Sequence, residues 1–522
     1  MIARAHEIEL AVVAFYMAVL VAMGLYFTRR QVSTDVYFVA KRSIPGWAMG
    51  LSMFATIITA VTVIAYPGAA YGGDWNLLVP GFMVIGVLAL VGSVIIPFFR
   101  KVVGMSAYEY FEKRFGPGVR MYASFTFAVG NFSKMAVVQY LLALTIGSMM
   151  GWRTLPIIAI VGMATVLYTL LGGMEAVVWT DVLQSVVLWT GLLVTLGFLL
   201  LMPSSHPREL FSLAAGAHKF SLGTTTWALS KPGILVLSLY GFFFYLQKYT
   251  ADQTLVQRYL VARTDQEALR GVALGALLCV PVWTLFMLVG TLLWSYYHLT
   301  AEKFPAYIQR PAQIFPYFLS THFPPLLVGL ILASLVGAAM ASMASDLNCI
   351  SVVAVEDFYR KARPGATDRD LLRAARFSVA IFGVLTMAFA TMLIHAHGTV
   401  LSVYYAITGI VAGGLAGLFL LAFVSRRARG SGVWTGVVVS LAFTIWATLT
   451  AKGGEFVNLG NWNYTWHPYL IGVVGNVLLF VFGYVASMVW HGRGTVGEEL
   501  TMWAWFGRMK LDRQAQKEAR LR

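Results

Sequence analysis

The sequence predicts an all-α protein that crosses a membrane many times. Of its 522 residues, 59% are hydrophobic and only 12% are charged, whereas about 25% of the residues of a soluble protein are charged. Apolar runs of roughly 20 residues recur from end to end, and each is long enough to cross a hydrocarbon core about 30 Å thick. An outer-membrane barrel would instead show alternating segments of about 10 residues, so the spans are predicted to be helices.

The apolar runs predict about thirteen spans. They cover residues 10–28, 46–70, 78–98, 121–149, 155–172, 178–202, 232–250, 270–297, 324–353, 375–396, 399–424, 433–451 and 468–491. With the N-terminus outside, the predicted inner segments hold 26 Lys or Arg and the outer segments hold 8. Basic residues gather on the cytoplasmic side of membrane proteins, so this asymmetry supports the span count, an outer N-terminus and an inner C-terminus.

The same asymmetry explains the net charge of +15, so no nucleic-acid partner is predicted. Cys279 and Cys349 both lie in apolar spans and offer neither a disulfide framework nor metal-ligand spacing. The sequence contains no HExxH, CxxC or GxSxG motif, so an enzyme is not predicted. The first span ends in Arg29 and Arg30, which argues against a cleaved signal peptide. The basic tail after His491 is predicted to lie on the inner leaflet or to be frayed.

The span at 46–70 has the composition of an interrupted helix. Thr56, Thr59 and Thr62 are β-branched and disfavour a regular helix. Unwound backbone is tolerated inside a membrane where it lines a cavity or binds an ion. Two interpretations stay open here: a helix broken near the threonines, or a helix that simply ends near Tyr66.

The stretch GAAMASMASDLNCIS lies in another apolar span and carries many oxygen atoms. Its residues Ala338, Ser342, Ser345, Asp346 and Cys349 recur at helical spacing and share one face. Small residues allow another backbone to approach closely, and hard oxygens suit a hard cation such as Na⁺. The alternative is a helix–helix seam whose serine hydroxyls bond to carbonyls of the preceding turn.

Four stretches resemble the sodium:solute symporter family, which includes sodium–glucose, sodium–proline and sodium–sialate transporters. They are DVYFVAKRSIPGWAMGLSMFAT at 35–56, YTLLGGMEAVVWTDVLQ at 168–184, DQTLVQRYLVART at 252–264 and SMASDLNCISVVAVEDFYRK at 342–361. They resemble the approach to the first core helix, the signature of the fifth, the end of the sixth and the eighth. Their order is that of the family, and together they cover most of the chain.

The resemblance implies a LeuT-like fold of two inverted five-helix repeats. It divides the chain into a leading helix and loop (1–45), a first repeat (46–202), an extracellular loop (203–231), a second repeat (232–424), two accessory helices (425–491) and a basic cytoplasmic tail (492–522). In the span count the first repeat starts inside and the second outside, as inverted repeats require.

The resemblance implies a sodium site between the first and eighth core helices. The carbonyls of Ala55, Ile58 and Ala338 match it, and so do the hydroxyl positions at Ala341 and Ser342. Ala341 departs from the family pattern because it lacks a hydroxyl.

A second sodium site of the family would use Asp181 and Ser345, with Asp346 as an additional carboxylate beside them. Ala344 again replaces a hydroxyl there. The alternative is that both aspartates are solvated charges at helix ends.

The resemblance places the solute beside the broken helices, near Thr59, Thr62, Lys134 and Asp252. The sugar-transporting branch has a Glu-Gln pair where this chain has Val61 and Thr62, which weakens a hexose interpretation. The sialate branch is more similar, because it holds the solute's carboxylate with a basic residue that matches Lys134. The alternatives are that Lys134 pairs with Asp252 or with backbone carbonyls.

The function implied is sodium-coupled import of a small organic solute, such as a sugar acid or carboxylate, by alternating access. Other candidates are a symporter for a neutral sugar or polyol, a proton-coupled carrier that uses Asp181, Asp252 or Asp346, and a sensor, which the short tail disfavours. Na⁺ is expected as the coupling ion, with no other cofactor. We expect a monomer in the lipid bilayer of a cell membrane, and short loops suggest a bacterial inner membrane.

Overall fold

Every named element of the computed structural model is helical, over the described residues 2–202, 206–306, 308–395, 414–454, 456–489 and 497–508. The long elements are α1 (Ile2–Thr28), α3 (Gly46–Ile57), α4 (Ala60–Gly72), α5 (Leu78–Val102), α7 (Pro117–Met150), α8 (Thr154–Leu201), α10 (Ile234–Thr250), α12 (Asp265–Thr300), α14 (Pro325–Val352), α16 (Asp368–His395), α18 (Leu415–Val424), α19 (Gly430–Gly454) and α20 (Tyr469–Val489). The short ones are α2 (Thr34–Val39), α6 (Glu109–Phe115), α9 (Pro207–Gly216), α11 (Gln253–Val261), α13 (Ile314–His322), α15 (Arg360–Ala362), a π-helical turn η3 (Val353–Tyr359) and the 3₁₀ turns η1 (Ala40–Arg42), η2 (Pro311–Gln313), η4 (Gly460–Trp462) and η5 (Glu498–Leu500).

The described helices differ from the thirteen predicted spans in identifiable ways. Eight are long and apolar enough to cross a membrane, and up to ten spans result if each of two bent pairs counts as one. Two predicted spans, 155–172 and 178–202, are joined in α8 by a turn at Gly173, whose φ is +57°. The helices α10 and α18 have only 17 and 10 residues. Part of the predicted span at 399–424, residues 399–413, lies outside the described residues.

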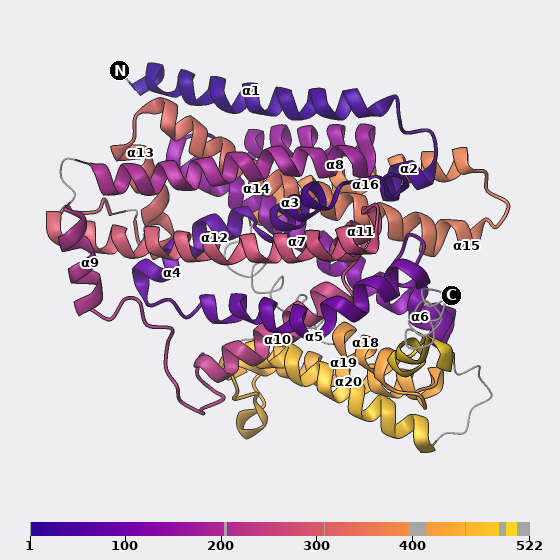
Figure 1. Ribbon diagram of the computed structural model, residues 1–522. Coiled ribbons are helices and arrows are strands. Elements are labelled where there is room, and N and C mark those ends of the chain that lie inside the picture. Colours follow the sequence, from indigo (N-terminus) through magenta and orange to yellow (C-terminus); the bar gives the residue numbers. More distant parts are fainter. Residues whose placement is uncertain are drawn as a thin grey trace, which may run out of the picture.

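The connecting segments sort to two ends of the helix bundle. The helices α9 and α13, from the predicted outer loops, lie at one end with the start of α1, while α2, α6 and α15, from predicted inner segments, lie at the other (Figure 1). This is the sorting that the distribution of basic residues predicts. The end with α2, α6 and α15 is called the inner end below, by that rule.

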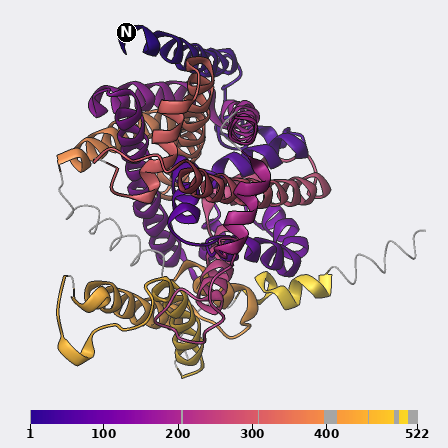
Figure 2. The same cartoon turned by 90° about the vertical axis from the view of Figure 1, so that its left-hand side faces the viewer.

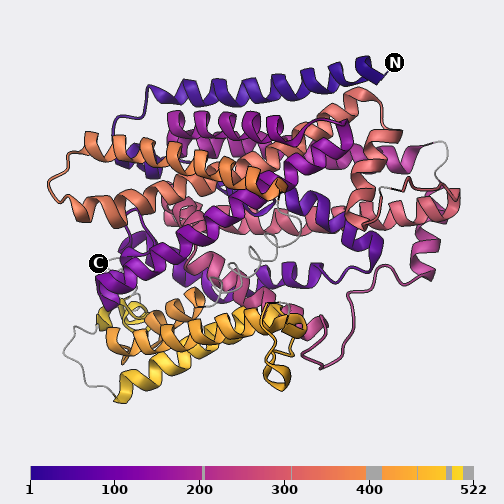
Figure 3. The same cartoon turned by 180° about the vertical axis from the view of Figure 1, so that it is seen from behind.

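The leading and final helices flank the rest of the structure. The helix α1 lies along one side, and α18, α19 and α20 lie on the opposite side in every view (Figure 2, Figure 3). Between them, α14 runs through the middle and contacts α1, α3, α7, α8 and α16. Every residue of α14 from Ile331 to Val352 is buried, which is typical of a helix that is enclosed on all sides.

The position of α3 is fixed by backbone contact with α12. Gly46 and Gly50 are four residues apart on α3, as are Gly271 and Gly275 on α12. A Cβ added to Gly50 would lie 2.6 Å from the carbonyl oxygen of Gly271, and one added to Gly275 would lie 2.7 Å from that of Gly50. Small residues at this spacing let two membrane helices touch along their backbones.

Candidate functional site

The first core helix is broken in the middle. Helix α3 ends at Ile57, Ile58 and Thr59 have extended backbones, and α4 begins at Ala60 with its axis turned by 59°. Of the two interpretations that the sequence left open, the interrupted helix is therefore confirmed. A helix that stops leaves its last carbonyls without amide partners, so Ala55 and Ile58 lie where backbone oxygens become available to an ion.

The threonines after the break stabilise the new helix start. The side chain of Thr59 accepts a hydrogen bond from the backbone of Thr62, and the Thr62 hydroxyl accepts one from the Thr59 amide at 3.4 Å. Such reciprocal capping satisfies donors that a helix start leaves free. Both residues predicted to bind the solute therefore have a structural role at the break.

Helix α14 faces this break with its small and hydroxyl residues. The Ser342 hydroxyl oxygen is buried and has no hydrogen-bond partner among the described residues. One turn further, the hydroxyls of Ser345 and Thr56 lie 3.2 Å apart, which places the end of α3 directly against α14. A buried oxygen without a partner costs free energy, and a bound cation would remove that cost.

The residues predicted for a second sodium site are divided between two cations of the chain. Asp181 Oδ2 accepts hydrogen bonds from Ser52 Oγ at 2.5 Å and from Arg258 Nη2 at 3.0 Å. The same Arg258 nitrogen donates to Ser345 Oγ. Asp346, next in sequence to Ser345, points instead to Lys134 on α7, with Nζ 2.8 Å from the carboxylate.

Arg258 is completely buried among these groups. The side chains of Arg258 and Asp181 are both 0% exposed. The guanidinium also donates from Nε to Ser52 Oγ at 3.0 Å and from Nη1 to the Thr254 carbonyl at 2.7 Å. The charge is therefore paired and its donors are used, as a buried charge requires.

The pairing of Lys134 differs from the structural alternative that the sequence suggested. Lys134 contacts Asp346, not Asp252. Asp252 accepts from Lys248 Nζ at 2.5 Å and from the Thr254 amide at 2.9 Å. It thereby caps the start of α11, next to the second break in the helices of the core. The predicted solute residue Asp252 is therefore bound to the chain on both of its oxygens.

Lys134 remains accessible on one side. Its side chain is 26% exposed, whereas that of Asp346 is 0% exposed. An ammonium has three donors, and Asp346 approaches it from the protein side. A solute that reaches the centre of the protein can therefore meet the free side of this cation.

The inner end below the breaks is closed by polar contacts. Gln253 accepts from the Ala107 amide at 2.7 Å and donates to the Met105 carbonyl at 2.7 Å. Asp357, buried in η3, accepts from Ser106 Oγ at 2.9 Å and from Arg120 Nε at 2.8 Å. These bonds join the segment between α5 and α6 to α11 and η3, and so close the path from the inner end.

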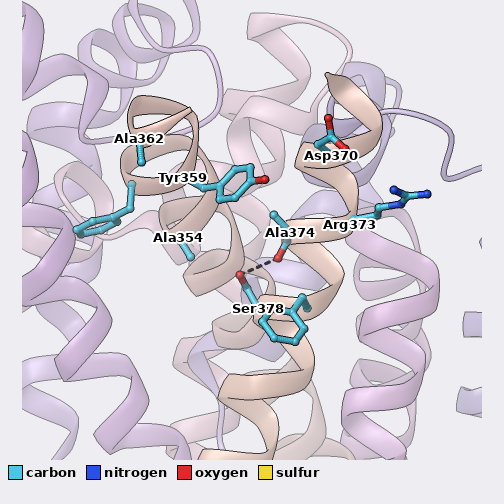
Figure 4. Close-up of a pocket in the computed structure, with 9 residues that line it drawn as sticks. Ala354, Tyr359, Ala362, Asp370, Arg373, Ala374 and Ser378 are labelled. Carbon is cyan, nitrogen blue, oxygen red and sulfur yellow. Dashed lines mark hydrogen bonds between the residues drawn. The ribbon is translucent and has the colours of Figure 1, made fainter. Parts of the chain in front are cut away.

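A separate cavity of about 780 Å³ lies away from all these residues. It lies between η3 with α15 and the start of α16, lined by Ala354, Phe358, Tyr359, Ala362, Asp370, Arg373, Ala374, Phe377 and Ser378 (Figure 4). Tyr359 points across it from η3, while Ser378 is bonded to the Ala374 carbonyl at 2.8 Å. None of the predicted sodium or solute residues lines it.

Sequence reasoning missed Arg258 and Ser52. It treated Arg258 as one of the basic residues of an inner segment, but all residues of α11 are buried. The available signal was Asp181, because a carboxylate within a span needs a cationic partner. Arg114 was misjudged in the same way: it is 1% exposed and donates to the carbonyls of Ala422 and Ser425.

Comparison with known proteins agrees with this geometry. The model of the sodium:solute symporter family matches residues 37–440. The sodium/sialic acid symporter NanT of Aliivibrio fischeri is 32% identical over 476 residues, 90% of this chain and 91% of that protein. The sodium/sialic acid symporter SiaT of Proteus mirabilis is 30% identical over 483 residues, 92% of this chain and 95% of that protein.

Solved structures confirm the LeuT-like fold class. A Na⁺-coupled sialic acid symporter in a substrate-bound, outward-open state has a TM-score of 0.84 and 30% identity, and the match covers 92% of this chain and 98% of that one. Mhp1, a nucleobase-cation-symport-1 family transporter, has a TM-score of 0.55 at 13% identity, over 89% of this chain and 97% of its own. The second likeness shows the shared fold alone.

Proposed function

The chain belongs to the sodium:solute symporter family, and we propose that it imports a sialic acid or a similar sugar acid together with Na⁺. Its role is sodium-coupled symport by alternating access, not catalysis. The sialic acid symporters NanT and SiaT match nine-tenths of the chain at 30–32% identity, which supports this solute class. Their bacterial origin also supports a multi-pass protein of a bacterial inner membrane, which we propose to act as a monomer.

The observation that carries the anionic solute is the position of Lys134. It is a cation inside a membrane-spanning helix, and its exposed side faces away from Asp346. A charged residue within a span marks a solute or ion pathway by default. A carboxylate that bonds to the free side of the ammonium would extend the ion pair to three members and gain a charge-assisted hydrogen bond.

The proposed sodium site joins the two halves of the core. The carbonyls of Ala55, Ile58 and Ala338 and the hydroxyl of Ser342 supply hard oxygens, and Ala341 contributes its carbonyl side only. Because Ser342 Oγ lacks a partner among the described residues, an ion there would satisfy an oxygen that the protein leaves free. An ion that bridges α3 and α14 favours the conformation in which both helices are in contact.

Coupling then follows from linked equilibria. Na⁺ and solute need only prefer the same conformation for each to raise the affinity of the other. The bonds of Gln253 and Asp357 close the inner end of that conformation. Release requires those bonds to break, so that the solute leaves on the opposite side.

Proton coupling is disfavoured by the pairing of the aspartates. Within the described residues Asp181, Asp252 and Asp346 each contact a cation: Arg258, Lys248 and Lys134. A carboxylate held by a cation is a poor proton carrier, because protonation would forfeit the pair. Sodium coupling, in contrast, uses oxygens that have no other partner.

Uptake by the purified protein in proteoliposomes tests the proposal. Radiolabelled sialic acid should accumulate when the outside buffer contains sodium and should not when choline replaces it. A neutral hexose at the same concentration serves as the comparison for solute class. Equal uptake in choline, or competition by hexose but not by sialic acid, would overturn the proposal.

A further inference from the structure

The centre of the protein holds three closed ion pairs. They are Arg258 with Asp181, Lys134 with Asp346 and Lys248 with Asp252. The three carboxylates are 0%, 0% and 6% exposed, respectively. With three cations and three anions, this region of the described structure carries no net charge before any ion or solute binds.

Arg258 occupies the space between the oxygens that a second sodium ion would need. Its Nη2 contacts both Asp181 Oδ2 and Ser345 Oγ, and its Nε contacts Ser52 Oγ. A guanidinium cannot be deprotonated in a protein, so this cation is permanent. A sodium ion at the same oxygens would displace these bonds and would lie beside an unscreened positive charge.

The neighbouring positions add no replacement ligands. Ala341 and Ala344 are both 0% exposed on α14 and have no side-chain oxygen. Asp181 Oδ1 is buried without a hydrogen-bond partner among the described residues. One oxygen is one ligand, whereas hard cations bound to proteins take several.

We propose that this symporter carries one sodium ion per solute, because Arg258 takes the place of a second. The inference rests on the function proposed above and adds its stoichiometry. With a monoanionic solute the fully loaded protein gains one positive and one negative charge. Its centre therefore stays neutral while it changes conformation, and a full transport event moves no net charge across the membrane.

The number of ions sets how far the solute can be concentrated. With the membrane potential held at zero, a tenfold inward sodium gradient limits accumulation to about tenfold for one ion and to about a hundredfold for two, since each tenfold ratio supplies the same free energy. For one Na⁺ and a monoanion, an imposed inside-negative potential should leave this limit unchanged. For two Na⁺ the limit should rise with the potential.

The experiment uses the full chain in two formats. Equilibrium binding of radioactive sodium to the purified protein, without solute, should give one ion per chain. Sialic acid accumulation in proteoliposomes should then follow the first power of the sodium gradient and be insensitive to potential. Two bound ions, or accumulation that follows the square of the gradient, would overturn the inference while the proposed function stands.

A variant separates the two sites in the binding assay. Ser342→Ala removes the free hydroxyl of the proposed site and should bring saturable sodium binding at the same concentrations below one ion per chain. One ion still bound with unchanged affinity would show a second site and contradict the inference. No saturable sodium binding to the unaltered protein would refute the proposed function itself.

Discussion

Lys134 on α7 and Asp346 on α14 form an ion pair across the centre of the protein, with the ammonium nitrogen 2.8 Å from the carboxylate. The lysine is partly exposed and the aspartate is completely buried. The same contact therefore stabilises the junction of two core helices and presents a cation to the solute. These two roles can be separated by experiment.

Lys134→Ala should lower both stability and uptake. It leaves Asp346 as a buried charge without its partner, which typically costs roughly 3–5 kcal/mol. Adding Asp346→Asn removes that charge and should restore most of the thermal stability. Sialic acid uptake should stay at least about tenfold below that of the unaltered protein, because a charge-assisted hydrogen bond contributes roughly 1.5–3 kcal/mol.

Thermal unfolding in detergent and uptake in proteoliposomes measure the two roles of Lys134. If the double variant recovers uptake along with stability, Lys134 is structural only. An unchanged affinity of the single variant for sialic acid would give the same answer.

Ser342→Ala should weaken sodium binding without weakening the sodium-free fold. Its oxygen has no partner among the described residues, so the loss removes a ligand but no existing hydrogen bond. We expect a decrease in apparent sodium affinity of about tenfold or more, in line with roughly 1.5–3 kcal/mol for a contact with a charge. The measurement is the sodium dependence of uptake and of the unfolding temperature.

A serine on the same helix provides the control. Ser334 is also buried in α14, but its hydroxyl already donates to the Leu330 carbonyl at 2.9 Å. Ser334→Ala should leave the sodium dependence unchanged. Equal effects of the two substitutions would argue against an ion at Ser342.

Arg258→Leu should destabilise the protein strongly. It removes the partner of Asp181, at 3.0 Å, in a site that is 0% exposed, and breaking a buried pair costs roughly 3–5 kcal/mol. Combination with Asp181→Asn should recover much of the loss. Arg258→Lys should not, because one ammonium cannot reproduce the planar set of donors to Ser52, Ser345 and Asp181. Fluorescence-detected thermal unfolding checks the order of the three variants.

Asp357→Asn should loosen the closed inner end. It weakens the bonds from Ser106 and Arg120 that hold the segment between α5 and α6. Cys349 reports opening, because its buried thiol donates to Gln257 on α11 at 2.9 Å. In a Cys279→Ala background, Asp357→Asn should raise the labelling rate of Cys349 several-fold.

An exposed aspartate at the same end serves as the control for this labelling. Asp370 bonds only to the nearby Thr367 in its own first turn, so Asp370→Asn should not change the rate. Sodium should slow labelling of the unaltered protein if it favours the closed inner end. Equal rates in Asp357→Asn and the unaltered protein would show that Asp357 does not hold the end closed.

The sequence by itself determined the class of protein, the approximate spans and the break at Ile58 and Thr59. These features are local: apolar length, the asymmetry of basic residues and β-branched residues within a span act over one helix or its ends. The resemblance to a family was equally readable from four short stretches, and the match over residues 37–440 confirms it.

The tertiary structure alone decided which buried charges form pairs. Asp181 and Arg258 are 77 positions apart, and Lys134 and Asp346 are 212 apart. Helical spacing shows which residues share a face, but not which face of another helix lies opposite. The partner of a buried charge depends on helix packing, and so Arg258 was counted with the basic surface although the fold places it in the centre.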